Sequence, residues 1–301
     1  MDKIVLWGCG RVGGKAYDKL TSNHNIVAFG DNDPNKQNLI YKGLPVIGFE
    51  EMKYKYADCR VVVTMENYYG EAERLSNHNM KTIGYYDVIR EKVLPWQKIS
   101  WDDVKKKKQI CLYAGDIYEN FDKYPDDYVI CLSLTWANYR SIQHDITIPY
   151  PLESNCIDCY QIEDVLEHIA LEKVIPALNE IYRILKKGGY LRCSLPDYHS
   201  PLVLHNSFLD KNGNIIFDPT GGGKFVEGKV CEGGHVWFPT YELVRELLEK
   251  SKFNNFKFYR YRNPDGRIYA EDIDYSRGYI NRTKEHTAYK EDISIVVDCF
   301  K

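Results

Sequence analysis

The chain has 301 residues, of which 44% are apolar, and its formal net charge is −3 at pH 7. This length and apolar content suit one large or two modest folded domains and exclude a largely disordered chain. The slight acidic excess leaves no basic footprint of the kind that nucleic-acid binders carry, so no nucleic-acid partner is expected.

Several features of the sequence favour a cytoplasmic protein. No run of 18 or more apolar residues is present, and the first residues, MDKIVLWGCG, lack the pattern of a signal peptide. The nine cysteines lie mostly within apolar runs, where a reduced thiol behaves as a small hydrophobe. Cys156 and Cys159 have the spacing of a zinc knuckle, but no second Cys/His pair follows at a suitable distance. The sequence therefore predicts no membrane span and no metal site.

The first elements in the chain predict half of a dinucleotide-binding fold. An apolar strand over residues 3–7 is followed by Gly8, Gly10 and Gly13, then a helical stretch and a second strand that ends at Asp31. In this pattern Gly8 makes the tight turn, Gly10 lets a phosphate approach the backbone, and Gly13 lets helix and strand close. Asp31 would accept a ribose hydroxyl.

Residues 1–95 resemble the small nucleotide-binding domain at the N-terminus of bacterial sugar acetyltransferases. The resemblance rests on Asp31-Asn32-Asp33, on the run GLPVIG at 43–48 and on the apolar strand ADCRVVVTM that follows. It implies a nucleotide or nucleotide-sugar as ligand. The domain is short for a complete dinucleotide site, so the alternative is a fold retained for packing, assembly or substrate presentation.

A polar connector is expected over residues 96–108, which end in a run of four lysines. The second domain then covers 109–301, and its first strands are expected in QICLYAGDI and DYVICLSLT because of their β-branched and apolar content.

The most informative stretch runs from Cys156 to Asp197 and predicts a strand, an amphipathic helix and a second strand. It contains VLEH at 165–168, RILKKGG at 183–189 and a closing Pro196-Asp197. This pattern resembles the second half of a class I S-adenosylmethionine-dependent methyltransferase, and with gaps the resemblance extends over residues 109–301. The two resemblances together imply an α/β protein of two Rossmann-like three-layer domains, the C-terminal one a seven-stranded methyltransferase sheet, with S-adenosylmethionine as cofactor.

The methyltransferase resemblance assigns the turn after the first strand of this domain to the methionine part of the cofactor. Here the turn holds Tyr113, Gly115 and Asp116, with one glycine where the family commonly has two or three. At the end of the second strand the family has an acid that accepts both ribose hydroxyls. This chain has Ser133 in a run without a carboxylate, so Ser133, Asn138 or a distant carboxylate replaces that contact, or the site has been lost.

The third and fourth cofactor positions also follow from the resemblance. Asp145 would accept from the adenine amino group while Ile146 packs on the ring, although Asp145 could instead only cap a turn. Glu163 and Asp164 follow the fourth strand. If a helix starts there, Asp164 shares a face with Glu167 and His168.

Three residues are candidates for the base that removes a proton from the acceptor: His168, Asp197 and His235. His168 and Glu167 could equally lock the corner between strand and helix, and His235 could only cap the helix that follows it. The insertion between residues 199 and 235 is expected to form a lid or hairpin. Its glycines at 221–223 do not have the spacing of a P-loop.

The sequence therefore predicts methyl transfer to a hydroxyl, amine or phosphoryl-linked oxygen on a small polar or glycan-type acceptor, which could be sugar-linked. Two rivals remain. One is a degenerate methyltransferase fold that serves as a nucleotide- or partner-binding module, and the other is a nicotinamide-dependent enzyme that uses the N-terminal glycines. The acceptor and the oligomeric state are left open.

Overall fold

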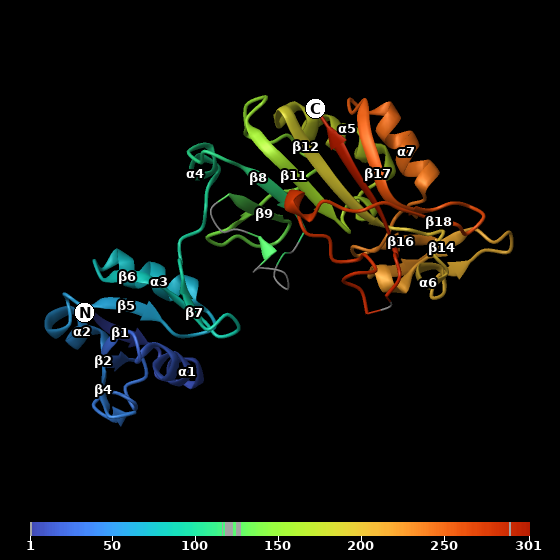
Figure 1. Ribbon diagram of the computed structural model, residues 1–301. Coiled ribbons are helices and arrows are strands. Elements are labelled where there is room, and N and C mark those ends of the chain that lie inside the picture. Colours follow the sequence, from blue (N-terminus) through green and yellow to red (C-terminus); the bar gives the residue numbers. More distant parts are fainter. Residues whose placement is uncertain (1, 116, 118–122, 125–127, 289) are drawn as a thin grey trace. The chain divides into compact units, whose positions relative to one another are not determined.

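A computed structural model describes the chain except residues 1, 116, 118–122, 125–127 and 289 (Figure 1). The chain divides into two compact units, Met1–Lys98 and Ile99–Lys301. The division falls within the stretch 96–108 that the sequence suggests as a connector. No helix in the described part of the chain is long and apolar enough to cross a membrane.

The N-terminal unit is built on one seven-stranded sheet. In sheet order its strands are β3 (Ile40–Tyr41), β4 (Leu44–Ile47), β2 (Asn25–Gly30), β1 (Lys3–Trp7), β5 (Arg60–Val63), β6 (Lys81–Asp87) and β7 (Lys92–Leu94). The five central strands are parallel, and β3 and β7 pair antiparallel at the edges. The connecting helices are α1 (Arg11–Leu20), α2 (Phe49–Lys55) and α3 (Tyr68–Asn77). The order of the five parallel strands is that of a doubly wound nucleotide-binding sheet.

The C-terminal unit is built on an eight-stranded sheet (Figure 1). In sheet order its strands are β10 (Ser141–Gln143), β9 (Val129–Ser133), β8 (Cys111–Ala114), β11 (Ile157–Glu163), β12 (Leu185–Pro196), β19 (Ser294–Phe300), β17 (Asn255–Arg262) and β18 (Ile268–Ala270). The first five are parallel, and the last three alternate in direction.

The expected count of seven strands is wrong by one, because β18 adds a strand at the edge. The residues between β17 and β18 form a tight turn in which Asn263 N donates to Arg267 O at 2.9 Å and Gly266 has a φ of +82°. This turn brings β18 back antiparallel to the end of β17. A three-residue strand has no readable periodicity, so the sequence does not reveal β18.

Helices cover one face of this sheet. They are α4 (Trp101–Lys105), α5 (Leu171–Ile184) and α7 (Tyr241–Lys250). Val104, Leu178 and Leu247, one from each, lie in a single core cluster with alternate residues of β19. Side chains alternate across a strand, and Val296 of β19 belongs to a different cluster with Ile280. Within the described residues, the loop that carries Ile280 thus covers the opposite face, where a three-layer fold would place helices.

The insertion after β12, for which the sequence suggests a lid or hairpin, forms a short helix and two hairpins. The elements are α6 (Pro201–Leu204), β13 (Phe208–Leu209), β14 (Ile215–Phe217), the 3₁₀ turn η3 (Pro219–Gly221), β15 (Lys224–Val226) and β16 (Lys229–Cys231). Two further 3₁₀ turns are η2 (Leu166–His168) and η4 (Tyr275–Arg277).

Candidate functional site

A cavity of about 650 Å³ lies at the carboxyl ends of the parallel strands of the C-terminal unit. Its walls come from the end of β8, the residues after β9 and β10, and the segment between β11 and α5. The chain passes from β8 to β9 and β10 on one side and to β11 and β12 on the other. The cavity therefore lies where the strand order reverses, which is where open α/β sheets bind ligands.

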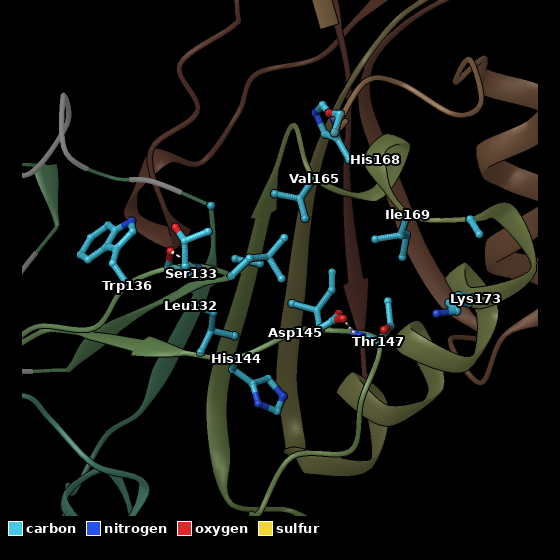
Figure 2. Close-up of a pocket in the computed structure, with 17 residues that line it drawn as sticks. Leu132, Ser133, Trp136, His144, Asp145, Thr147, Val165, His168, Ile169 and Lys173 are labelled. Atoms are coloured by element: carbon cyan, nitrogen blue, oxygen red, sulfur yellow. Dashed lines mark hydrogen bonds between the residues drawn. The ribbon is translucent and has the colours of Figure 1, made fainter. Parts of the chain in front are cut away.

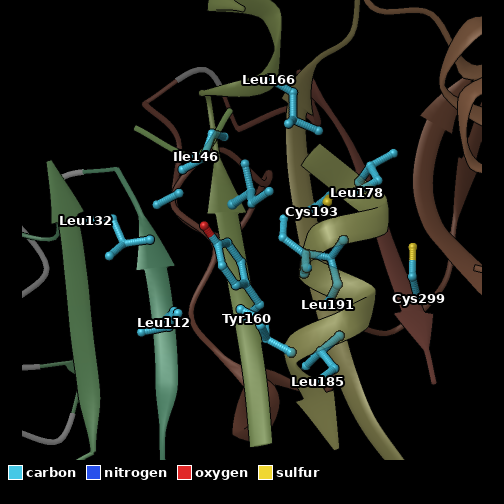
Figure 3. Close-up of a cluster of buried hydrophobic side chains, with 14 of the residues drawn as sticks. Leu112, Leu132, Ile146, Tyr160, Leu166, Leu178, Leu185, Leu191, Cys193 and Cys299 are labelled. Carbon is cyan, nitrogen blue, oxygen red and sulfur yellow. The ribbon is translucent and has the colours of Figure 1, made fainter. Parts of the chain in front are cut away.

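Asp145 and Ile146 both line this cavity (Figure 2). Asp145 Oδ1 accepts from Thr147 N at 2.8 Å, so this side chain caps a turn and also faces the cavity. Ile146 is buried and belongs to the same core cluster as Leu132 (Figure 3). One wall of the cavity is thus an extension of the apolar core.

Gly115 forms the turn after β8 and also lines the cavity. Its φ of +120° is strained for any residue with a side chain, and a Cβ there would lie 3.3 Å from Glu163 O. The turn therefore needs glycine. Asp116, its predicted neighbour in the site, lies outside the described residues.

Ser133 ends β9 at the cavity wall, where the methyltransferase resemblance leads one to expect an acid. Its hydroxyl accepts from Thr135 N at 3.3 Å. Asp145 is the one carboxylate among the described residues that line the cavity.

Tyr113 and Glu163 are not among the residues that line the cavity. Tyr113 Oη donates to Glu163 Oε1 at 3.2 Å, and Asn281 N donates to Oε2 at 2.8 Å. Burial, with a smaller contribution from Asp164, raises the pKa of Glu163 to about 7. Burial also raises the pKa of Tyr113 well above its usual value. These two residues tie β8 and β11 to the loop over the other face of the sheet.

Asp164 adopts a left-handed backbone conformation, with φ of +51°, and its Oδ1 pairs with Arg282 Nη1 at 3.2 Å. Burial raises its pKa, and the guanidinium of Arg282 opposes that shift. No helix begins here: the chain makes one 3₁₀ turn at η2 before α5 starts at Leu171. The shared helical face expected for Asp164, Glu167 and His168 is therefore wrong.

His168 is the one base candidate that lines the cavity. Its Nδ1 lies 2.6 Å from Gly233 O, a carbonyl that can only accept, so Nδ1 carries the proton. The ring centroids of His168 and His235 are 4.6 Å apart.

His235 is buried beside His168 and is held by a polar relay. Its Nδ1 lies 2.5 Å from Tyr198 Oη, and that hydroxyl donates to Asp218 Oδ2 at 2.6 Å. Burial, and then the neighbouring His168, lowers the pKa of His235 to about 4. His235 is therefore neutral at physiological pH.

Glu167 completes this group, which we call the histidine cluster: Glu167, His168 and His235. Glu167 is fully buried, and neither of its carboxylate oxygens has a hydrogen-bond partner among the described residues. Its Oε1 lies 3.7 Å from His235 Nε2. Burial raises its pKa well above the usual value.

Asp197 is placed differently from the other two base candidates. It is buried, its Oδ1 accepts from His199 N at 3.0 Å, and its Oδ2 accepts from Arg262 N at 2.6 Å. It is not among the residues that line the cavity. Both oxygens thus hold backbone at the end of β12.

The N-terminal glycines adopt the geometry of a dinucleotide-binding turn. Gly8 has a φ of +126°, and a Cβ on Gly13 would collide with the carbonyl oxygen of Gly8. Asp31 lies beside this turn and accepts from Cys9 N at 2.9 Å and from Lys36 Nζ at 3.1 Å. Its carboxylate is therefore already engaged within the unit.

Residues 111–193 match a family model described as a methyltransferase domain. This match covers β8 and the turn with Gly115, the cavity wall at Ser133 and Asp145, and the turn that carries Glu167. The matched segment lies entirely within the C-terminal unit. A search of curated proteins finds no match to the chain.

Similar solved structures share little sequence with the chain. A methyltransferase from Thermotoga maritima, described as a possible histamine N-methyltransferase, is 17% identical over 64% of this chain and 82% of its own, with a TM-score of 0.39. A methyltransferase from Archaeoglobus fulgidus is 13% identical over 65% and 87%, with a TM-score of 0.38. A UDP-D-quinovosamine 4-dehydrogenase from Vibrio fischeri is 19% identical over 34% and 96%, with a TM-score of 0.26.

Glu167 is a member of the histidine cluster that the local sequence pattern does not single out as a site residue. The sequence feature that points to this site is the pair Glu167-His168 taken together with His235, which lies 67 positions after His168. Nothing in the local pattern connects the two segments. The contact exists because Val236 N donates to Glu167 O at 2.9 Å and joins the insertion to η2.

Proposed function

We propose that the chain is an S-adenosylmethionine-dependent methyltransferase that binds the methyl donor in the cavity of its C-terminal unit. The observation that carries this proposal is the pair Asp145 and Ile146 on the cavity wall, inside the segment that matches a methyltransferase domain. A carboxylate accepts about four hydrogen bonds, so the bond from Thr147 leaves capacity for the adenine amino group. The apolar side chain next to it offers a surface for the ring.

The residues present fit most of the cofactor. A cavity of about 650 Å³ lies within the usual range for ligand sites, roughly 300–1,000 Å³. Gly115 keeps the turn after β8 free of a side chain, as close approach of a ligand requires. Ser133 would meet the ribose with a hydroxyl in place of the expected acid.

The bound cofactor supplies an already activated methyl group, so the protein chiefly aligns the acceptor and manages a proton. His168 is suited to the second task, because it faces the cavity and its protonated Nδ1 leaves Nε2 as an acceptor. Asp197 and His235 would act indirectly, by holding the end of β12 and the ring of His168.

Calorimetry with S-adenosylhomocysteine, the demethylated product, tests the proposal. If Asp145 contacts adenine, Asp145→Asn should weaken binding by about 10- to 100-fold, because the amide turns a donor toward the adenine amino group. If Asp145 only caps the turn, the asparagine oxygen preserves the cap and affinity stays unchanged.

Asp265→Asn is the matched control. Asp265 caps an exposed turn in the same way, with Oδ1 accepting from Arg267 N at 3.0 Å, but it does not line the cavity. This variant should bind like the parent chain. Failure of the parent chain itself to bind either S-adenosylmethionine or its product would refute the proposal.

A small polar acceptor, glycan-like or sugar-linked, is the second part of the proposal. The insertion presents a row of partly exposed rings, Phe208, Phe217 and Phe225, whose neighbouring centroids are 6.1 Å and 5.8 Å apart. Aromatic faces offer flat apolar surface to a sugar ring. A nucleotide or nucleotide-sugar held by the N-terminal unit belongs to the same proposal, supported by its glycine turn and strand order.

The missing carboxylate at the end of β9 favours one rival function. A methyltransferase fold that has lost its donor site would serve as a nucleotide- or partner-binding module. In that case sugar nucleotides would bind while S-adenosylmethionine and its product would not. Titration of both ligand classes into the same preparation separates the two functions.

A further inference from the structure

We propose that Glu167, His168 and His235 form a binding site for a divalent transition-metal cation, with an open coordination position toward the cavity. Their ligand atoms lie within 4.8 Å of one another. Two imidazoles and one carboxylate are a common set for Zn²⁺ and its first-row neighbours.

The first argument is the environment of Glu167. This carboxylate is fully buried, and no described group donates a hydrogen bond to either oxygen. A buried, unpartnered carboxylate costs several kcal/mol unless a cation compensates it or a proton neutralises it. Arg282 compensates it only in part, because its guanidinium pairs with Asp164 at 3.2 Å and donates no hydrogen bond to Glu167.

The second argument is the tautomer of His235. The hydrogen of Tyr198 Oη goes to Asp218, so this oxygen must accept from His235 Nδ1. The proton of the neutral ring is thus on Nδ1, and Nε2 presents a lone pair. That lone pair faces Glu167 Oε1 at 3.7 Å, and with Glu167 ionised both atoms are acceptors. A proton on Glu167 or a cation between the two groups would relieve this arrangement, and the 3.7 Å gap is too long for a direct hydrogen bond.

His168 supplies a third lone pair by the same logic. Gly233 O engages its Nδ1 at 2.6 Å, which leaves Nε2 as an acceptor. Metal-bound histidines are typically oriented by a carbonyl or carboxylate on the second ring nitrogen, and here both rings have such a partner. Tyr198, held by Asp218, would orient His235, and the carbonyl of Gly233 would orient His168.

The chain also makes room for the ring of His235. A Cβ on Gly221 would lie 2.5 Å from its Cγ, so only glycine fits there. The segment DPTGGG at 218–223 thus positions His235. Asp218 accepts the hydrogen bond from Tyr198, and Gly221 leaves space for the imidazole ring. Metal–ligand bonds of about 2.0–2.2 Å at a tetrahedral angle place ligand atoms about 3.3–3.6 Å apart, so binding would draw the three side chains inward.

His168 and Gly233 line the cavity, whereas Glu167 and His235 are buried behind them. A cation held by three protein ligands would therefore keep its remaining position on the cavity side, as catalytic sites do. Its role there rests on the proposed function: it would bind a hydroxyl oxygen of the acceptor and lower the pKa of that hydroxyl, in place of proton transfer to His168, whose Nε2 the cation would occupy. Cation binding itself does not depend on the methyl donor.

Titration of Co²⁺ into the full chain, followed by visible absorption, tests the site. The expected result is about one Co²⁺ per chain, displaced by Zn²⁺ because Zn²⁺ binds nitrogen and oxygen ligands more tightly. Glu167→Gln and His168→Ala should lower the affinity by at least about 100-fold. Tyr198→Phe, which removes only the relay hydroxyl, should lower it by about 10- to 100-fold.

Two measurements guard against loss of folding as the explanation. The glutamine of Glu167→Gln can donate to His235 Nε2. In the absence of metal, the Tm of this variant should therefore be no lower than that of the parent chain. His205→Ala removes an exposed histidine outside the histidine cluster and should bind Co²⁺ like the parent.

The proposal is wrong if the folded parent chain binds no Co²⁺, or if Glu167→Gln and His168→Ala bind it as the parent does. Calorimetry with S-adenosylhomocysteine on the same samples keeps the two proposals apart. Product binding without Co²⁺ binding would remove the cation site and leave the methyltransferase assignment standing. Co²⁺ binding without product binding would support the cation site and refute the methyltransferase proposal.

Discussion

Glu163 and Glu167 lie four residues apart, yet their surroundings differ in kind. Glu163 accepts two hydrogen bonds, from Tyr113 and Asn281, whereas Glu167 accepts none among the described residues. The sequence shows two acids near the end of a strand and cannot distinguish them. The difference comes from residues 281 and 235, which local periodicity does not connect to this turn.

Glu163 gives a prediction about stability and pH. Its pKa of about 7 in the folded chain exceeds the usual 4.5, so between these values the folded state holds more of this proton than the unfolded state. The contribution of Glu163 to the free energy of unfolding therefore falls as pH rises from about 5 to 8. At about 1.4 kcal/mol per pKa unit, the change is at most about 3 kcal/mol.

Urea unfolding at pH 5 and pH 8 checks this expectation. Glu163→Gln cannot titrate, so it should lose less stability than the parent chain over this interval, by up to about 3 kcal/mol. Glu172→Gln, at an exposed position on α5, should follow the parent. Equal losses in the parent and Glu163→Gln would show that Glu163 has an ordinary pKa in the folded chain.

Among the elements, those with clear periodicity were predictable. The strand and helix expected between Cys156 and Asp197 are present as β11 and α5, with Val174, Leu178 and Ile181 buried. The end of the helix was not predictable from Gly188-Gly189. The helix ends at Ile184 and β12 begins at once, with Leu185 paired to Ile157 of β11, and Gly188 N donates to Lys301 O just beyond the end of β19. That partner lies 113 positions away, and no local rule reports it.

The turn between β1 and α1 gives the second prediction. A Cβ on Gly10 would meet nothing within 4 Å, and the backbone there is extended, so Gly10→Ala should change the free energy of unfolding by less than about 0.5 kcal/mol. If a phosphate docks at the N-terminus of α1, the added methyl group would obstruct it. Affinity for a nucleotide-sugar would then fall by tenfold or more.

Calorimetry with a panel of nucleotide-sugars on the parent and on Gly10→Ala measures this effect. Gly70→Ala is the matched control, because Gly70 is an exposed residue of α3 and an added Cβ would meet nothing within 4 Å. Binding that is equal in all three chains would place the ligand elsewhere, and binding by none would favour a unit retained for packing or assembly.

At the scale of the whole chain, the question is where the second unit begins. The sequence suggests a connector over 96–108 and a domain from 109, since the lysine run looks solvated. In the structure, however, Val104 on α4 is fully buried in the core of the C-terminal unit, and Ile99 and Trp101 pack against that core. Helix α4 begins with a capping box between Ser100 and Asp103, which marks it as a built element.

This difference gives the third prediction, which compares the stability of two fragments. A fragment of residues 99–301 keeps α4, whereas a fragment of residues 109–301 loses Val104 and its apolar neighbours. Burial of one such side chain contributes about 1.5–3 kcal/mol, so the shorter fragment should be less stable by roughly 2–5 kcal/mol. Val104→Ala in the longer fragment should reproduce about half of that loss by leaving a cavity under α4. Urea unfolding of the three chains tests this prediction. Equal stability of the two fragments would make residues 99–108 a solvated connector. A deficit in the shorter fragment, with about half of it in Val104→Ala, would make α4 part of the core of the C-terminal unit.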